Sequence, residues 1–204
     1  ASGRRGGKGK VGRVQPRAAG RAEQINEQEG RYTSYLRGRE NGGKVDRKRV
    51  ISSVSRCLNP YEKADYDAMM EVAVSDDLEY IVSNTTEAGI VYDPTCGKED
   101  CPPSSFPAKL TQVLYKRWQA GKKPVVILSC ELIDNNGKEL EKCVKQYIAQ
   151  WGLEEDFAKW CGECTFCSTL VDRIVPGRVK DPAEASRLDE ENGYHDELVD
   201  VGEV

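Results

Sequence analysis

Residues 79–90 read EYIVSNTTEAGI, in which a short apolar run is followed by a polar turn. Ile81 and Val82 belong to a short apolar run, which is too short for a helix and predicts a buried strand. The run stops at a turn rich in hydroxyl and amide groups, SNTTEAG at 83–89. In an open α/β sheet, ligands bind just beyond the carboxyl ends of the strands. The turn is therefore a candidate sugar or nucleotide site, although Ser, Asn, Thr and Gly also occur in ordinary strand-to-helix turns.

A second turn of the same kind follows the apolar run VVILSC at 125–130. It carries Glu131, Asp134, Asn135 and Asn136, directly before a glycine and an amphipathic stretch. If the two runs form adjacent parallel strands, both turns lie at the same edge of the sheet. Asn136 is then either the N-cap of the following helix or a donor to a substrate carbonyl oxygen that gains negative charge.

Helix and strand patterns alternate around these turns. Apolar residues recur at helical spacing in four stretches, 60–74, 106–120, 140–151 and 156–170. Further strand patterns occupy 11–14, 32–39, 49–54 and 125–128. Alternation of this kind over residues 60–150 indicates βαβ units, and hence an α/β fold with a parallel sheet.

Length and composition are those of a soluble protein with one domain, or one domain and part of another. The chain has 204 residues, of which 38% are hydrophobic and 31% are charged. Its longest apolar run, at 125–128, is far shorter than a membrane-spanning segment, and no secretory signal is visible. We therefore expect a cytoplasmic protein without a membrane partner.

The formal net charge of −4 conceals an asymmetry along the chain. Residues 1–50 carry 14 basic and 5 acidic residues, whereas residues 181–204 carry 1 basic and 9 acidic residues. A basic arm can bind nucleic acid, but the basic residues before residue 11 alternate with glycine and lack aromatic neighbours for base stacking. We expect residues 1–10 to be a disordered or frayed basic segment, with no nucleic-acid partner.

The eight cysteines are expected to be free thiols, because no signal peptide places the chain in an oxidising compartment. The sharpest cluster is CGECTFC at 161–167, with a Cys-x2-Cys-x2-Cys spacing. Together with Cys96 or Cys101, it could supply four thiolates to zinc or an iron–sulfur cluster. However, no second Cys-x2-Cys pair lies at zinc-ribbon distance, and the chain has one histidine. We therefore expect buried thiols and no bound metal.

Five ordered stretches resemble a known family. They are SSVSRCLNP at 52–60, VSNTTEAGI at 82–90, DCPPSSFPAKLT at 100–111, CELIDNNG at 130–137 and LVDRIVPG at 170–177. Together they are similar to the tagaturonate reductases, also called altronate oxidoreductases, of the long-chain polyol (mannitol) dehydrogenase family. The resemblance runs from about residue 9 to the C-terminus. It implies interconversion of D-altronate and D-tagaturonate, with NAD as the cofactor and a sugar acid as the small-molecule substrate.

The resemblance also implies a partial Rossmann-like fold. This fold is α/β, with a parallel sheet and flanking helices, followed by the start of a helical C-terminal domain. The family's glycine-rich phosphate-binding turn and its catalytic lysine have no counterpart here, and the glycine-dense stretch at 2–9 follows no strand. We expect residues 11–176 to be part of the dinucleotide-binding domain and residues 177–204 to begin the catalytic domain. Such a fragment is expected to be inactive by itself.

The resemblance assigns residues to the site position by position. Residues of the first turn line the cofactor near its nicotinamide end: Ser83, Asn84, Thr85, Thr86 and Glu87. Asn136 corresponds to the asparagine that polarises the reacting carbonyl. Val171 and Asp172 correspond to a segment that reaches the substrate hydroxyls, although Asp172 could instead form a surface pair with Arg173. Ser168 departs from the family pattern, which has asparagine there.

Two other functions stay open at this point. One is a different enzyme of the same family, a fructuronate reductase or a mannitol dehydrogenase. Glu131-Leu132 stands where the family's enzymes with neutral substrates have an Asp-Asn pair, which favours the uronate branch. The other is a non-catalytic, cysteine-rich module that binds metal. Cofactor binding and metal content would separate these functions.

Overall fold

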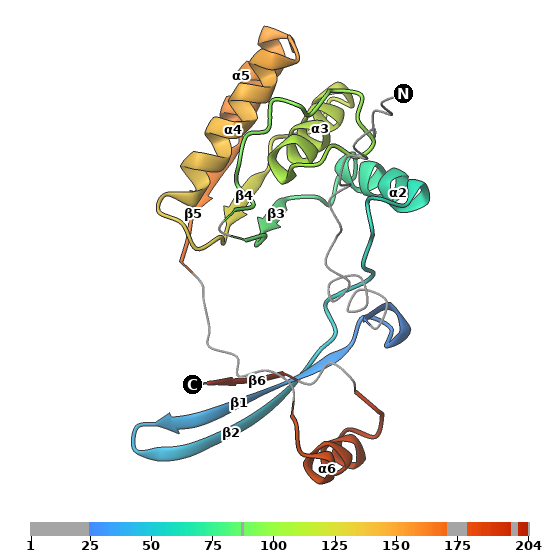
Figure 1. Ribbon diagram of the computed structural model, residues 1–204, viewed down its shortest axis with the longest axis vertical. Coiled ribbons are helices and arrows are strands. Elements are labelled where there is room, and N and C mark those ends of the chain that lie inside the picture. Colours follow the sequence, from blue (N-terminus) through green and yellow to red (C-terminus); the bar gives the residue numbers. More distant parts are fainter. Residues whose placement is uncertain (1–24, 87, 171–178, 197–199, 204) are drawn as a thin grey trace, which may run out of the picture. The chain divides into compact units, whose positions relative to one another are not determined.

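The computed structural model describes residues 25–86, 88–170, 179–196 and 200–203. The chain forms two compact units, one made by Leu58–Arg173 and the other by the described parts of 1–57 and 174–204 (Figure 1). The strand expected at 11–14 and the boundary expected at residue 176 lie outside the described residues. The division into residues 1–10, 11–176 and 177–204 stays a prediction.

The larger unit, Leu58–Arg173, is built on a three-stranded parallel sheet in the order β3-β4-β5. Its strands are β3 (Tyr80–Ser83), β4 (Val126–Ser129) and β5 (Thr165–Ser168). Tyr80 is in register with Val126, and Val126 with Thr165. The prediction of adjacent parallel strands is therefore confirmed, and the turns after β3 and β4 leave the sheet at the same edge.

Four helices belong to this unit, as Figure 1 shows: α2 (Lys63–Ala73), α3 (Phe106–Gln119), α4 (Asn136–Gln150) and α5 (Glu155–Glu163). Helix α3 begins at a serine cap, where the Ser105 hydroxyl accepts a hydrogen bond from the Ala108 backbone N–H at 3.2 Å. The chain leaves α3 through Gly121, whose φ of +66° suits glycine. These helices agree with the expected α/β fold of a parallel sheet with flanking helices.

The helix expected over 156–170 is only partly present. Helix α5 ends at Glu163, Cys164 is extended, and residues 165–168 form β5 instead. The edge of β4 offers backbone partners that a local helical pattern cannot reveal, and the Thr165 N–H donates to the Val125 carbonyl at 3.1 Å. Phe166 packs against the core from this strand. Tertiary pairing thus overrides local spacing here.

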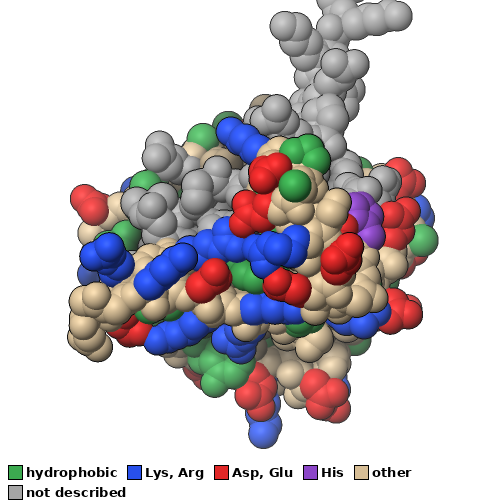
Figure 2. Space-filling model, turned by 90° about the horizontal axis from the view of Figure 1, so that it is seen from below, with side chains coloured by type: hydrophobic (Ala, Val, Ile, Leu, Met, Phe, Trp, Pro, Cys, Tyr) green, Lys and Arg blue, Asp and Glu red, His purple; other side chains and the backbone are tan. Residues whose placement is uncertain are grey.

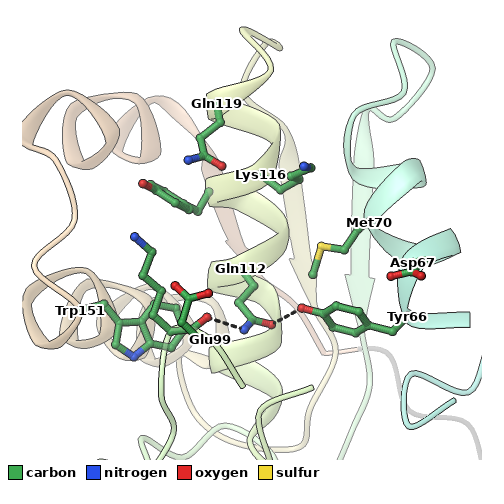
Figure 3. A pocket seen from close by; sticks show the side chains of 10 residues that line it. Tyr66, Asp67, Met70, Glu99, Gln112, Lys116, Gln119 and Trp151 are labelled. Carbon is green, nitrogen blue, oxygen red and sulfur yellow. Dashed lines mark hydrogen bonds between the residues drawn. The ribbon is translucent and has the colours of Figure 1, made fainter. Parts of the chain in front are cut away.

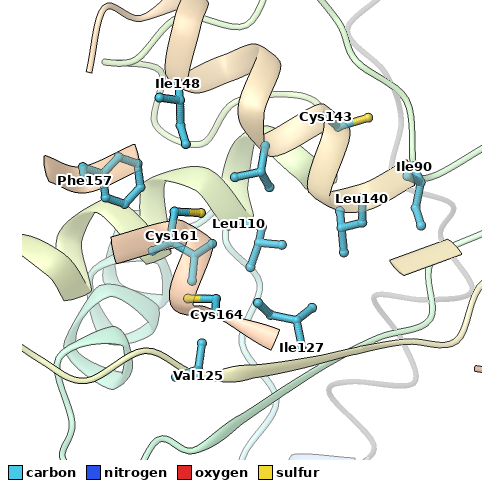
Figure 4. Packing of buried hydrophobic residues seen from close by; sticks show 12 residues of the cluster. Ile90, Leu110, Val125, Ile127, Leu140, Cys143, Ile148, Phe157, Cys161 and Cys164 are labelled. Atoms are coloured by element: carbon cyan, nitrogen blue, oxygen red, sulfur yellow. The ribbon is translucent and has the colours of Figure 1, made fainter. Parts of the chain in front are cut away.

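The core of the larger unit lies between the sheet and its helices (Figure 4). It consists of buried apolar side chains from β4, α3, α4, α5 and the segments beside them: Ile90, Leu110, Leu114, Val125, Ile127, Leu140, Cys143, Val144, Ile148, Phe157, Cys161 and Cys164. Ile81 of β3 and Phe166 of β5 are partly buried and pack against this cluster. Side chains on the opposite face of β3, Tyr80 and Val82, are exposed. The apolar stripes predicted for α3 and α4 therefore face the core, as expected for amphipathic helices.

The smaller unit is built on a sheet in the order β2-β1-β6. The hairpin of β1 (Tyr32–Glu40) and β2 (Gly43–Ile51) turns at Asn41 and Gly42, with φ of +50° and +81°, as a two-residue Asn-Gly turn requires. Strand β2 begins at Gly43, six residues before the strand expected at 49–54. Helix α6 (Pro182–Asn192) agrees with a helical segment after residue 177, but β6 (Asp200–Glu203), parallel to β1, is not predicted.

The hairpin carries basic side chains that are interspersed with acidic partners. Arg37 pairs with Asp46 at 3.3 Å and with Glu184 of α6 at 2.6 Å, and Arg47 pairs with Glu40. Figure 2 shows the same mixture of blue and red side chains on one face of the molecule.

No described helix is both long and apolar enough to cross a bilayer.

Candidate functional site at the carboxyl edge of the parallel sheet

A serine ends each of the three parallel strands. Ser83 of β3 is in register with Ser129 of β4, and Ser129 with Ser168 of β5. These residues and the turns that follow them form the carboxyl edge of the sheet, where open α/β sheets bind their ligands. The sequence prediction that the two polar turns lie at one edge is therefore confirmed by the strand register.

Glu131 is the buried centre of this edge, with a residue exposure of 2%. One of its carboxylate oxygens accepts from the Ser83 hydroxyl at 3.0 Å, and the other accepts from the Thr85 N–H and hydroxyl, both at 3.1 Å. A buried carboxylate needs such donors, because each unpaired lone pair would keep its desolvation cost. Glu131 therefore fastens the turn after β4 to the turn after β3.

The predicted cofactor-binding residues separate into two groups. The hydroxyls of Ser83 and Thr85 are turned inward onto Glu131, whereas Asn84 and Thr86 are exposed. Gly89 makes this turn possible, because a Cβ there would lie 1.8 Å from the Thr85 hydroxyl oxygen. The inward hydroxyls of Ser83 and Thr85 therefore shape the turn. Contact of the exposed Asn84 and Thr86 with a cofactor stays a prediction.

The Asn136 side chain is buried and makes four hydrogen bonds to the backbone. Its Nδ2 donates to the Glu131 carbonyl at 2.8 Å and to the Thr169 carbonyl at 2.9 Å. Its Oδ1 accepts from the N–H of Gly137 at 2.8 Å and from the N–H of Thr169 at 3.1 Å. The Asn136 side chain therefore joins the loop after β4, the start of α4 and the segment after β5, because each of these three segments contributes a hydrogen-bond partner.

These contacts bear on both roles that the sequence left open for Asn136. The N-cap of α4 is Asn135, in the left-handed region at φ +54°, so the capping position lies one residue earlier. Donation to a substrate carbonyl stays a prediction, and it requires Asn136 to exchange one of the two bonds that its Nδ2 makes.

The start of α4 approaches β5 closely at Gly137. A Cβ on Gly137 would lie 2.6 Å from the carbonyl carbon and oxygen of Cys167, which no side chain tolerates. The Gly137 N–H also donates to the Ser168 hydroxyl at 3.1 Å. Ser168, where the family pattern has asparagine, thus ties β5 to the N-terminus of α4.

Ser129 has an orphan hydroxyl at the same edge. Its Oγ is the one buried side-chain nitrogen or oxygen within the described segments that lacks a hydrogen-bond partner. Nearby, Thr169 donates its hydroxyl to the Ser129 carbonyl at 2.6 Å and to the Cys130 sulfur at 3.5 Å. An unpaired buried hydroxyl is costly, so its presence beside the candidate site fits a water or ligand group as its partner.

Three predicted site residues cannot be placed. Glu87, Val171 and Asp172 lie outside the described residues, and their roles stay predictions. Sequence reasoning did not find the fastening roles of Glu131, Gly137 and Thr169. The sequence signal for the role of Glu131 is an acidic residue two positions after the end of β4, next to the hydroxyl-rich turn that follows the neighbouring strand β3.

Neither a metal site nor the pocket beside α2 and α3 involves the predicted site residues that the structure describes. Among the described ranges, no group of three or more His, Cys, Asp or Glu side chains is arranged to hold a metal ion, and the expected absence of metal stays a prediction. A pocket of about 480 Å³ lies beside α2 and α3 (Figure 3). There Gln112 accepts from the Tyr66 hydroxyl at 3.0 Å and donates to the Lys98 carbonyl at 2.9 Å. None of the predicted site residues lines that pocket.

Curated relatives resemble most of this chain. An altronate oxidoreductase of Bacillus subtilis (strain 168) is 46% identical over 200 residues, which cover 96% of this chain and 41% of the relative. An altronate oxidoreductase of Klebsiella pneumoniae (strain 342) is 42% identical over 196 residues, or 93% of this chain and 40% of the relative. The chain thus spans about two fifths of the length of these relatives.

Solved structures share the fold. A substrate-free D-sorbitol dehydrogenase matches with a TM-score of 0.71 and 25% identity, over 94% of this chain and 40% of that one. The Pseudomonas fluorescens mannitol 2-dehydrogenase, solved with NAD and D-mannitol, matches with a TM-score of 0.72 and 21% identity, over 93% of this chain and 39% of that one. At these identities the likeness concerns the arrangement of strands and helices.

A family description covers almost the whole chain. The mannitol dehydrogenase Rossmann domain matches residues 12–203, which include both compact units and the whole carboxyl edge of the parallel sheet. The expected Rossmann-type fold is confirmed by this match and by the parallel sheet with its flanking helices. This chain belongs to the mannitol dehydrogenase family, through the family's Rossmann domain.

Proposed function

We propose that this chain is the cofactor-binding part of an NAD-dependent oxidoreductase that interconverts D-tagaturonate and D-altronate. The observation that carries the proposal is the 46% identity, over 96% of the chain, to an altronate oxidoreductase. The polar turns at the carboxyl edge of a parallel sheet support it, because dinucleotides bind at that edge. Altronate appears in the names of the relatives, and its assignment as a substrate of this protein is our proposal.

The residues at the edge suit a polar, hydroxyl-rich ligand. Asn84 and Thr86 offer exposed amide and hydroxyl groups. NAD, when bound, accepts or supplies the hydride. Glu131 holds Ser83 and Thr85, and so keeps the turn in one shape before the ligand arrives. A preorganised turn lowers the entropy cost of binding.

The experiment uses this chain within a protein of the relatives' full length. NADH consumption is followed with D-tagaturonate, D-fructuronate and D-fructose, and the three values of kcat/KM are compared. We expect D-tagaturonate to have the highest value. A preference for D-fructuronate or D-fructose would replace the proposal with a fructuronate reductase or a mannitol dehydrogenase. No turnover and no NADH binding, together with about one bound metal ion per chain, would favour the metal-binding module.

The cofactor contacts are tested by NADH binding to the same protein. Asn84→Ala removes one exposed amide from the turn and is expected to raise Kd by about fivefold to tenfold, the effect of one lost hydrogen bond. Gln119→Ala is the matched control, because it removes an exposed amide on α3, away from the turn. Equal affinities of the two variants would contradict the placing of the cofactor at this turn.

The proposed role of Asn136 has its own readout. If its amide polarises the reacting carbonyl, Asn136→Ala lowers kcat by about 10²–10³-fold, because the donor acts mainly in the transition state. The measurement is made well below the melting temperature of the variant, so that unfolding does not contribute. A folded variant with the kcat of the unmodified protein would leave Asn136 with its backbone-fastening role alone.

The cytoplasm is the location we propose for this activity, with a sugar acid as the partner molecule. A protein of the relatives' full length, expressed from its own gene with a C-terminal tag, would be found in the soluble cytoplasmic fraction. Recovery in the periplasmic or membrane fraction would contradict this location.

A further inference from the structure

Two cysteines of the CGECTFC stretch meet at the end of α5. Cys161 lies in the last turn of the helix, and Cys164 follows it in extended conformation. The Cys164 N–H donates to the Cys161 carbonyl at 3.1 Å, which closes a turn of four residues. Such a turn keeps the two Cα atoms within about 7 Å, close to the range of about 4.4–6.8 Å in disulfides.

Both thiols are buried in the same core cluster, and each shifts the pKa of the other (Figure 4). The third cysteine of the stretch, Cys167, is placed differently, because it lies in β5 and outside that cluster. The spacing of the stretch thus contains one thiol pair and one separate thiol.

Arg117 makes the surroundings of this pair unusual. Its guanidinium is buried, with 3% of the residue exposed, and its N–H groups donate to four backbone carbonyls, those of Ala73, Ser75, Leu78 and Lys123, at 2.7–3.0 Å. Within the described segments it forms no ion pair with a carboxylate. A buried positive charge without an anion favours negative charge on a nearby group.

These surroundings shift the pKa values of the two thiols in opposite directions. The hydrogen bond from Cys161, the Val125 N–H and the Arg117 charge lower the pKa of Cys164, against the effect of burial. The hydrogen bond to Cys164, together with burial, raises the pKa of Cys161. In this pair, Cys164 is therefore the sulfur that loses its proton more readily, and Cys161 is the one that keeps it. Reactive dithiols commonly combine two such thiols.

A pocket gives access to the pair. Its volume is about 460 Å³, and it lies between the second half of α4 and α5, with Cys161 on its wall. Apolar side chains, Ile148, Leu153 and Ala158, make up much of the rest of the lining. A small neutral molecule can enter such a pocket, whereas a charged oxidant would lose its hydration there.

We propose that Cys161 and Cys164 form a redox-sensitive dithiol, which a small peroxide entering through this pocket converts into a disulfide. The Cys161 sulfur attacks one oxygen of hydrogen peroxide as its proton passes to the Cys164 thiolate. The O–O bond breaks, a sulfenic acid forms at Cys161, and the departing hydroxide takes up a proton from solvent and becomes one water. The Cys164 sulfur then attacks the Cys161 sulfur, and the hydroxyl leaves with the Cys164 proton as a second water. The two sulfurs lose two electrons in total, and the peroxide gains them.

The disulfide would form at the opposite end of β5 from the candidate site. Strand β5 starts at Thr165, directly after Cys164, and leads through Ser168 to Thr169. Those two residues hold Gly137 and Asn136. Oxidation of the pair would therefore change the strand that holds the start of α4 in place.

The test is differential labelling of the 204-residue chain after brief treatment with hydrogen peroxide. Free thiols are blocked with one alkylating reagent, disulfides are reduced, and the released thiols receive a second reagent. The tryptic peptide 160–173, WCGECTFCSTLVDR, carries all three cysteines of the stretch. We expect the second label on Cys161 and Cys164 and the first label on Cys167, at peroxide levels about tenfold below those that oxidise the other cysteines.

Single substitutions sharpen the result. Cys161→Ser and Cys164→Ser should each abolish the second label in the peptide. Cys143→Ser, a substitution at another buried cysteine of the same core cluster, should leave it unchanged. Circular dichroism shows whether each variant folds, and where one does not, labelling of the unmodified chain decides alone. First label on all three cysteines, or second label on Cys167, would overturn the proposal.

Discussion

The two units of this chain rely on different kinds of interaction. The larger unit has a cluster of twelve buried apolar residues between a parallel sheet and its helices. The smaller unit has a cluster of two, Tyr35 and Leu188, with Val179 packed against them. In its place, buried polar groups meet at Asp196, which accepts from the Thr33 N–H at 2.7 Å and from the Tyr194 hydroxyl at 3.1 Å. A substitution that opens a cavity should therefore destabilise mainly the larger unit, whereas one that removes a buried charge should destabilise mainly the smaller unit.

Fluorescence separates the two units. All three tryptophans of the chain, Trp118, Trp151 and Trp160, belong to the larger unit. Tryptophan emission therefore reports unfolding of Leu58–Arg173, whereas amide hydrogen exchange in β1 and β2 reports the smaller unit.

The largest effect is expected from Phe157→Ala in the core of the larger unit. Phe157 is fully buried and contacts the rings of Tyr115, Trp118 and Trp160, with centroids 5.2–6.1 Å apart. Its removal should lower the free energy of unfolding by about 3–5 kcal/mol, the usual cost of truncating a buried aromatic side chain. The measurement is urea unfolding followed by tryptophan emission. Leu170→Ala, at a residue that is 80% exposed, is the control and should have little effect.

Asn136→Ala should cost less, about 2–4 kcal/mol. It leaves buried backbone groups of Glu131, Gly137 and Thr169 without the partners they have now, and each unpaired group costs about 1–3 kcal/mol before water or relaxation restores part of it. Urea unfolding by tryptophan emission measures the loss. Asn84→Ala, at an exposed asparagine in the first turn, serves as the control. Equal stability of both variants would contradict a fastening role for Asn136.

In the smaller unit, Asp196→Ala should cost about 1–3 kcal/mol, because the buried Thr33 N–H loses its acceptor. The loss should be seen as faster amide exchange in β1, with the tryptophan transition unchanged if the units unfold separately. Glu40→Ala, which removes an exposed partner of Arg47, should change exchange little. A shift of the tryptophan transition by Asp196→Ala would show that the two units unfold together.

The smallest effect is a pH dependence of the smaller unit. The hydrogen bond from His195 and the Asp196 N–H lower the pKa of Asp189, against a small effect of burial. Since the pKa is lower in the folded state, this stabilisation is complete above the ordinary aspartate pKa, about 4, and is lost as the pH falls through the lowered value. Exchange in β1 should therefore accelerate below about pH 4, and less so in Asp189→Asn. An identical acid response of both proteins would exclude Asp189 as a cause.

Local pattern was sufficient for much of the fold. The hairpin turn, α3, α4 and the adjacent strands β3 and β4 follow from turn residues and apolar spacing. Strands β5 (TFCS) and β6 (DVGE) were not predicted, because neither contains an aliphatic run like those of β3 (YIVS) and β4 (VILS). The apolar spacing of 156–170 continues past Glu163, so nothing local marks the point where α5 gives way to β5.

The candidate site likewise has features that local sequence predicts and features that depend on tertiary contacts. The amino-acid sequence predicted that hydroxyl and amide groups follow two apolar runs, and the resemblance of five ordered stretches indicated the family. Folding sets which of those groups turn inward and which stay exposed. Ser83 and Thr85 turn inward to Glu131, and Asn136 gives all its bonds to the backbone, because a buried carboxylate and a buried amide each take the nearest partners that offset their desolvation. Those partners come from strands and helices that only folding brings together.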